Sequence, residues 1–490
     1  MDSQTSDSKN QDVVENKSLS ISHALIPVVL LVAMLAYNVF VFGDSSLNGS
    51  NQFILLMGAA VAVVIGFINK VPYKNMVAEV SQNVKSTSTA LLILLMVGAL
   101  SGTWLISGII PTMIYYGLQV LNPTIFLAAC VVICAVLSIS IGSSWTTSAT
   151  VGIALIGIAN ALDISLGMTA GAILSGAYFG DKLSPLSDTT NLAPAMAGTD
   201  LFTHIRYMTY TTIPSFVVAL VAFIIIGFTL DSSGQADTAE ILAAINERFF
   251  ITPWLFLVPA FVIFLIVKKT PPLIALLSGT LVAAVLALIL QPDLILIAAE
   301  ETTWNLANAY KGVMNAITVD IKIPTNFKLL EELFIAGGMA GMLPTIWLIL
   351  CAMVFGGVMD AIGALAKISE SLLKLFTSTF GLFASTVSSC LAINLTASDQ
   401  YLAIVVPGKM FAKAYEEKGL APENLSRTLE DAGTVTSVLI PWNTCGAYHS
   451  GVLGVPVADY FIYAIFNYVS PFMTLLFAAF NIKIRQLKKN

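Results

Sequence analysis

Residues 180–194 read GDKLSPLSDTTNLAP, and this polar stretch decides the fold. Apolar runs at 164–179 and 207–230 flank it, so its place in the chain is at membrane depth. It nevertheless carries two aspartates, a lysine and several hydroxyls. Irregular backbone and ionisable side chains are tolerated inside a bilayer only where they line a polar cavity or are buried against protein. The stretch therefore predicts a membrane helix broken by a polar segment, which is typical of ion sites in secondary transporters.

The composition indicates a protein that crosses the membrane many times. Of its 490 residues, 57% are hydrophobic and 11% are charged, and many apolar runs are long enough to span a bilayer. The sequence has no basic face with interleaved aromatic residues, so the expected partner is the lipid bilayer and not nucleic acid. It also lacks HExxH, and YFGD at 178–181 lacks the first glycine of a GxGD motif. We expect a transporter without a cofactor, not an enzyme.

Two further polar stretches interrupt apolar runs. GSSWTT at 142–147, which we call the first tip, and NLTASDQ at 394–400, the second tip, are followed by the short apolar runs 151–161 and 401–408. A helix needs about 20 residues to cross the hydrocarbon core. We therefore predict that residues 124–161 and 376–412 form re-entrant hairpins, each made of two half-depth helices that meet at a tip.

The second half of the chain repeats the first. LMVGALSGTWLISG at 95–108 resembles LCAMVFGGVMDAIG at 350–363, and the first polar break (181–191) corresponds to the second polar break (441–449), at an offset of roughly 250 residues. The two copies begin on opposite sides of the membrane. The predicted fold is an all-α polytopic inverted-repeat transporter with two re-entrant hairpins and two broken transmembrane helices.

The distribution of basic residues predicts the orientation. Among the 23 lysines and arginines, only Arg248, Lys311, Lys322 and Lys328 fall outside and Lys182 falls within the membrane if both termini are cytoplasmic. The expected segments are a polar cytoplasmic tail 1–21, a first repeat 22–230 with a broken helix 164–200, an outer loop 231–251, a second repeat 252–482 with an outer insertion 291–337 and a broken helix 427–458, and a basic tail 483–490.

The tips and breaks should converge near the midplane and supply oxygens for a cation. Sodium prefers about five or six hard oxygen ligands from carbonyls, hydroxyls, amides and carboxylates. The candidate ligands are Ser143, Ser144, Thr146, Thr147, Ser187, Thr189, Asn191, Thr396, Ser398, Asn443 and Thr444.

Three aspartates are candidates for coupling Na⁺ to H⁺, namely Asp188, Asp181 and Asp399. The sequence favours Asp188 because it follows Pro185 in the break, and Asp399 in the second tip is the second choice. A carboxylate in such a place can hold either a proton or sodium. The alternative is that each caps a helix or, for Asp181, pairs with Lys182. His449 is a candidate pH sensor, although a single histidine is more often structural. Glu430 and Asp431 are expected to be solvated near a helix end, and His204 to be solvated at an interface.

GDKLSPLSDTTNLAPA at 180–195 and PWNTCGA at 441–447 resemble the signature of the NhaC family of sodium/proton antiporters, within the ion-transporter superfamily. The resemblance covers most of the chain and implies sodium extrusion in exchange for protons across a bacterial inner membrane. Relatives of this family are similar to malate–lactate exchangers and amino-acid carriers.

A carrier of small organic anions, coupled to sodium or protons, is therefore the alternative function. Such a carrier normally uses an arginine to clamp the carboxylate, and the sequence places no arginine at membrane depth. Li⁺ and a small carboxylate remain candidate ligands beside Na⁺ and H⁺, and a homodimer is a candidate assembly.

Overall fold

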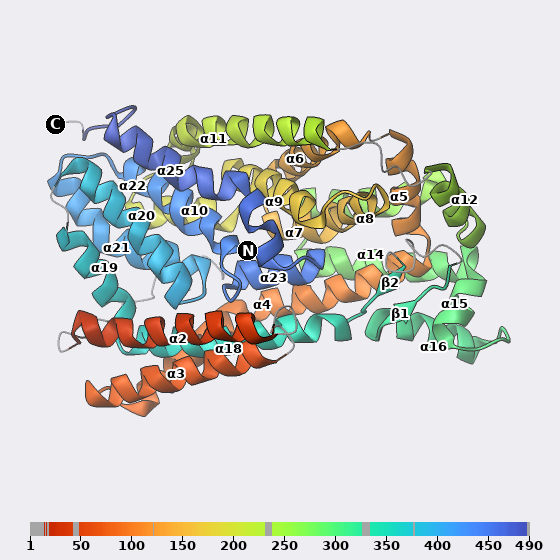
Figure 1. Cartoon of the computed structure of the whole chain (residues 1–490), viewed down its shortest axis with the longest axis horizontal. Helices are drawn as coiled ribbons and strands as arrows, with labels where there is room; N and C mark the ends of the chain where they lie inside the picture. The colour runs from red at the N-terminus through yellow and green to blue at the C-terminus, as the bar shows by residue number, and fades with distance from the viewer. Residues whose placement is uncertain are drawn as a thin grey trace.

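The computed structural model describes residues 14, 16, 19–42, 49–120, 122–230, 238–325, 334–375 and 378–487. Parts of the predicted N-terminal tail, outer loop, outer insertion, second hairpin and basic tail lie outside these residues. The described chain is almost entirely helical (Figure 1).

The helices of the first half are α2 (Ile21–Phe42), α3 (Ser50–Ile68), α4 (Tyr73–Ile106), α5 (Ile109–Val120), α6 (Pro123–Ile141), α7 (Ser144–Thr147), a π-helical turn (Ser148–Gly152), α8 (Ile153–Ala161), α9 (Leu166–Leu183), α10 (Asp188–Ala197), α11 (Leu201–Thr229) and α12 (Thr238–Arg248).

The second half contains a 3₁₀ turn (Pro253–Phe256), α13 (Leu257–Val267), α14 (Pro272–Leu290), α15 (Pro292–Ala299), α16 (Leu306–Thr318), β1 (Ile321–Lys322), β2 (Ile335–Ala336), a 3₁₀ turn (Ala340–Met342), α18 (Leu343–Ala361), α19 (Ala364–Leu375), α20 (Thr379–Thr396), α21 (Gln400–Glu417), α22 (Pro422–Leu429), a π-helical turn (Glu430–Thr434), a 3₁₀ turn (Ser437–Leu439), α23 (Thr444–Leu453), α24 (Val457–Tyr460), a 3₁₀ turn (Phe461–Tyr463) and α25 (Ile465–Ala479).

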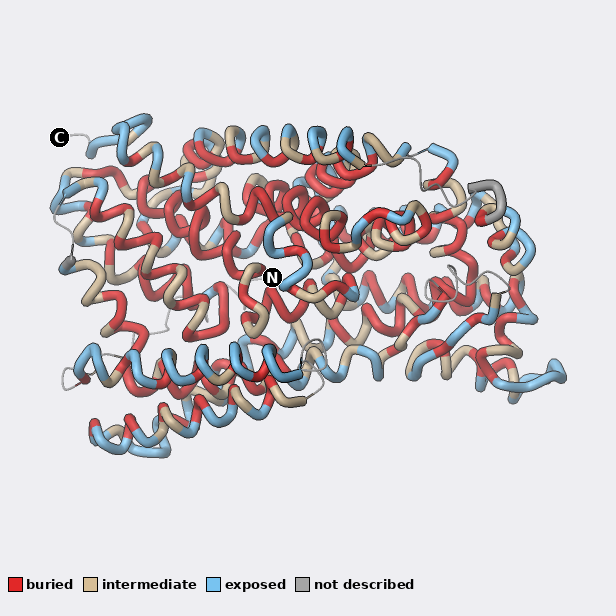
Figure 2. Tube along the Cα trace, in the orientation of Figure 1, coloured by how far each residue is buried: buried red, intermediate tan, exposed pale blue. Residues whose placement is uncertain are grey.

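Eight of the described helices are long and apolar enough to cross a membrane. Two further pairs of helices, each bent at a break, raise this number to ten possible spans if each pair crosses as one. In Figure 1 the long helices run roughly along the long axis, with α11 on one side and α2 and α3 on the other. The outward faces of these helices are exposed although they are apolar (Figure 2). Such faces are stable against lipid and not against water. The structure is thus that of an all-α polytopic membrane protein.

Further elements lie at the two ends of the bundle. α19 to α22 gather at one end, and α12, α15, α16 and the strands gather at the other (Figure 1). β1 and β2 form an antiparallel pair in which Ile321 faces Ala336.

The runs that follow the tips are longer than expected. Ser143 caps α7 by accepting a hydrogen bond from the Thr146 N–H, and Asp399 caps α21 through the Leu402 N–H. These caps start helices inside the polar stretches. Ser144 to Ala161 is therefore continuous helix, and α21 has 18 residues. α6 and α20, expected to be half-depth, also reach spanning length with 19 and 18 residues.

Both predicted helix breaks are present. α9 ends at Leu183 and α10 begins at Asp188, while the last turn of the second broken helix ends at Leu439 and α23 begins at Thr444. Pro185 and Pro441 lie in the gaps, because proline lacks the N–H that would continue the helical ladder. Each gap ends with a polar N-cap, Ser187 before α10 and Asn443 before α23.

Candidate functional site

The first tip contacts the first break through Asp181. The Asp181 carboxylate is buried, and its Oδ2 accepts hydrogen bonds from the Ser144 N–H (3.0 Å) and the Ser144 hydroxyl (2.7 Å). The Ser187 hydroxyl lies beside the same carboxylate. Two predicted ligands and one predicted coupling residue therefore meet at one place, joining α7, α9 and the start of α10.

Asp188 does not lie where the sequence suggested. We expected it in the unwound segment, but it is the first residue of α10 and is exposed. The Ser187 side chain explains the difference, because it caps α10 by accepting from the Thr190 N–H and so makes Asp188 the first helical residue. The Tyr401 hydroxyl of α21 lies within reach of the Asp188 carboxylate. Thr189 is buried, whereas Asn191 is exposed and donates to the Pro185 and Ser187 carbonyls.

The other hydroxyls of the first tip serve the tip itself. The Ser143 Oγ accepts from both the Thr146 N–H and the Thr146 hydroxyl at 3.2 Å, and the Thr147 hydroxyl donates to the Ser143 carbonyl at 2.9 Å. The Thr146 and Thr147 hydroxyl oxygens only donate in these bonds and keep their lone pairs, whereas the Ser143 Oγ uses both of its lone pairs to close the first turn of α7.

The second tip contacts the second break in a similar way. The Asn443 side chain caps α23 and donates to the Asn394 carbonyl and side-chain oxygen, both at 3.1 Å. The Thr444 N–H donates to the Ser398 carbonyl at 2.9 Å. Thr396 donates to a carbonyl of its own helix. Asp399 is buried and caps α21, which is the structural role we gave as the alternative to coupling.

Aromatic rings link the first tip to the second break. Trp145 stacks on Tyr448 with ring centroids 4.0 Å apart, and the Tyr448 hydroxyl donates to the Trp145 carbonyl at 3.2 Å. His449 is fully buried against Trp145, Tyr178 and Tyr448. Neither of its ring nitrogens has a hydrogen-bond partner among the described residues.

The strongest charge cluster was missed by the sequence analysis. Lys182 and Asp431 form an ion pair, and both side chains are fully buried. Asp431 also accepts from Thr211 at 2.8 Å, from Ser470 at 3.0 Å and from Thr474. One carboxylate therefore ties the π-helical turn 430–434 to α9, α11 and α25. The sequence feature that could have revealed this ion pair is Lys182, because a lysine at membrane depth requires an acidic partner.

Three further expectations of solvation were wrong. Asp431 and Glu430 are fully buried because the helix end on which they lie packs inside the bundle. The Glu430 carboxylate lies near the Thr189 and Thr434 hydroxyls without a well-aligned hydrogen bond. His204 is buried, with its Nδ1 2.8 Å from the Ser426 hydroxyl. Arg427, expected among the cytoplasmic residues, is fully buried as well.

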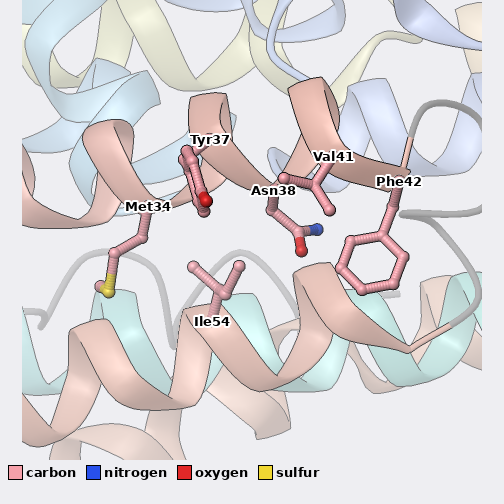
Figure 3. A pocket seen from close by; sticks show the side chains of 6 residues that line it. All are labelled: Met34, Tyr37, Asn38, Val41, Phe42 and Ile54. Carbon is pink, nitrogen blue, oxygen red and sulfur yellow. The ribbon is translucent and has the colours of Figure 1, made fainter.

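A pocket of about 230 Å³ lies elsewhere, between α2 and α3 (Figure 3). Its Asn38 amide already donates to the Ser50 hydroxyl and to the Asn51 side chain, both at 2.8 Å. Its lining is otherwise largely apolar, so it offers no cation ligand set. The lining residues are Met34, Tyr37, Asn38, Val41, Phe42 and Ile54.

Comparison with known proteins places the chain in a family. Residues 176–482 match the model of the Na⁺/H⁺ antiporter family. The chain is 34% identical over 468 residues to the Na⁺/H⁺ antiporter NhaC of Alkalihalophilus pseudofirmus, covering 96% of this chain and 97% of that protein. It is 33% identical over 424 residues to NhaC of Bacillus subtilis, covering 86% and 90%.

A third relative has a different stated activity. The malate-2H⁺/Na⁺-lactate antiporter of Bacillus subtilis is 34% identical over 458 residues, which cover 93% of this chain and 92% of that protein. The family match and the identity over nearly the whole chain confirm the resemblance that residues 180–195 predicted: this chain belongs to the Na⁺/H⁺ antiporter family.

Proposed function

We propose that the protein exchanges Na⁺ for H⁺ across the bacterial inner membrane and that the two ions compete for Asp181. The observation that carries this proposal is the position of Asp181, buried where the first tip meets the first break. The hydroxyls of Ser144 and Ser187 lie beside its carboxylate. Hydroxyl and carboxylate oxygens of this kind are the ligands that hard cations select.

Asp181 fits an exchanging role better than the other acids. The oxygens of Asp431 already accept from a lysine and three hydroxyls, so a cation would have to displace several donors. Asp399 is engaged as a helix cap. Asp188 is exposed and lies near the Tyr401 hydroxyl of α21, so it is better placed to bind the cation on its way to the buried site. We therefore rank Asp181 before Asp188 and Asp399, with Lys182–Asp431 as a fixed charge pair.

The proposed framework is an inverted repeat. Support comes from residues in the left-handed region that occur in pairs: Gly108 with Gly363, Gly142 with Ser398, and Gly198 with Gly454. Their offsets of roughly 250 residues equal that of the sequence repeat. Each pair occupies the same place, after α4 and α18, at the two tips, and after α10 and α23. With both termini cytoplasmic, the end formed by α19 to α22 faces the cytoplasm.

Reconstituted protein tests the proposal directly. Sodium added to proteoliposomes should drive proton flux reported by a pH-sensitive dye, and lowering the pH should raise the apparent sodium constant because the ions compete. Asp181→Asn should abolish exchange, since an amide neither titrates nor carries the charge, whereas Asp188→Asn should retain part of it. The exposed Asp293→Asn serves as the matched control. Normal, pH-dependent exchange by Asp181→Asn would reject the assignment.

Exchange of small organic anions is a second candidate. One relative is a malate-2H⁺/Na⁺-lactate antiporter, and the sequence argument against this function was that no arginine lies inside the membrane region. What favours it is Arg427, whose side chain is fully buried in the bundle and has the donor geometry that binds a carboxylate.

A further inference from the structure

The Arg427 guanidinium is buried without an acceptor. Arg427 lies in the last turn of α22 and is fully buried. Its Cζ is 4.6 Å from the ring centre of Tyr207 on α11 and 5.8 Å from that of Phe477 on α25. Nε, Nη1 and Nη2 have no hydrogen-bond partner among the described residues. Burial of a cation in this manner is strongly unfavourable unless an anion compensates it.

The nearest acids along the helix are not positioned to supply that anion. Glu423, one turn earlier, is paired with Arg485 at 2.5 Å. Asp431, one turn later, is paired with Lys182. Glu430 makes no ion pair with Arg427 in the part of the chain that the structure describes. The two neighbouring acids on this helix therefore already have cations, and Arg427 keeps a net positive charge in the interior.

The N–H groups that lie in the plane of the Arg427 guanidinium remain available to bind a planar acceptor. Aromatic rings interact with a guanidinium mainly as cation–π partners, whereas the N–H groups point outward in the guanidinium plane and match the two oxygens of a carboxylate. A second polar atom lies at the same contact of α11 with α22. His204, one turn before Tyr207, bonds to Ser426 through Nδ1, and its buried Nε2 has no partner among the described residues.

We propose that Arg427 binds the carboxylate of a small organic acid that the protein carries together with its coupling ion. This deepens the second candidate function and rests on the protein being a transporter. In Figure 1, α22, α25 and the start of α11 lie at the end where the C-terminus is found. There the Tyr207 hydroxyl donates to the Lys483 carbonyl and the Asn424 amide to the Arg485 carbonyl at 2.7 Å. Segment 483–487 therefore covers α22 at this end, and the acid would have to reach Arg427 from the same, proposed cytoplasmic, side.

Carboxylate binding can be measured separately from ion exchange. Thermal unfolding of the full chain in detergent would be followed at constant sodium concentration with added lactate or malate, and with phosphate or chloride as comparison anions. Lactate or malate should raise the midpoint saturably in the natural protein. Arg427→Lys keeps the charge but loses the paired N–H donors of the planar guanidinium, so the apparent Kd for the acid should rise about tenfold or more. Arg427→Gln should not respond, and the exposed Arg206→Gln on α11 should respond normally.

Three results would overturn the inference. They are no response of the natural protein to either acid, an unchanged Kd in Arg427→Lys, or a response to phosphate alone. If Arg427→Gln does not fold, the natural protein and Arg427→Lys still decide the question. Sodium-driven proton flux without carboxylate binding would reject only this inference. Carboxylate binding without sodium-driven flux would reject only the proposed sodium/proton exchange.

Discussion

Replacing Lys182 by methionine, Asp431 by asparagine, or both, measures how strongly the buried ion pair holds the helices together. Each single variant leaves one buried group without its partner, which costs about 3–5 kcal/mol of unfolding free energy. In Asp431→Asn, Lys182 loses its charged partner and keeps only neutral ones, namely the Ser470 hydroxyl at 3.2 Å, the Phe466 ring with its centre 5.6 Å away and the amide oxygen. In Lys182→Met, the carboxylate keeps three hydroxyl donors, so this variant should fall near the lower figure.

The double variant should be more stable than either single variant. It contains no unpaired charge, and the amide still offers an oxygen to the surrounding hydroxyls, so its cost should be about 2–3 kcal/mol from weakened hydrogen bonds. The expected coupling energy is therefore at least about 3 kcal/mol. Unfolding free energies would be measured by denaturant titration in detergent, and proton flux in proteoliposomes should persist in the double variant.

An exposed pair provides the control for this cycle. Lys413 and Glu417 approach to 3.7 Å with side chains 84% and 66% exposed, so their coupling should stay below about 0.5 kcal/mol. If the costs at Lys182 and Asp431 add within about 0.5 kcal/mol, the two groups do not interact and the ion pair does not hold the helices together.

Two further predictions concern the first tip and the surface. Gly142→Ala should destabilise the protein by clearly more than about 1 kcal/mol, because φ is +76° and a Cβ would lie 2.6 Å from the Leu186 Cβ. Gly198→Ala is the control, because its φ is +83° but the space around it is open, so it should bear only the backbone strain. Equal losses of stability in thermal unfolding of the two variants would contradict this explanation. Hydrogen bonds from Lys374 and then Lys367 hold the pKa of Glu370 below its usual range. The stabilisation by Glu370 is therefore present above the unfolded pKa of about 4.3 and is lost as pH falls through the lower folded pKa. Glu370→Gln should cost under about 1 kcal/mol of unfolding free energy at pH 7 and nothing in strong acid, which denaturant titrations at the two pH values would show.

The broad architecture could be predicted because its causes are local. Apolar runs of spanning length identify the membrane helices, and Pro185 and Pro441 interrupt them by lacking an N–H. The contact of each tip with its break also followed, since broken helices must satisfy each other's backbone. The contacts of Ser144 with Asp181 and of Ser398 with Thr444 have this origin.

The charge pairing could not be predicted because its cause is not local. Asp431 lies in a polar segment that resembles a solvated helix end, and only tertiary packing brings it to Lys182, 249 residues away. Asp188 was misplaced for a different reason. Its environment depends on whether Ser187 caps α10, and proline three residues before Asp188 indicates a break without fixing where the next helix begins.

The wide separation of Lys182 and Asp431 bears on how the chain is made. Lys182 enters the membrane at the end of α9 while its partner is still to be synthesised. A lysine at the centre of an apolar helix makes insertion unfavourable by about 2.5–3.5 kcal/mol, and Lys182, in the last turn of α9, should bear part of this cost. Until residue 431 arrives, α9 must hold this charge near a headgroup, in the insertion machinery or against another membrane protein. The first half of the chain alone should therefore insert poorly, and co-expression of the second half should rescue it.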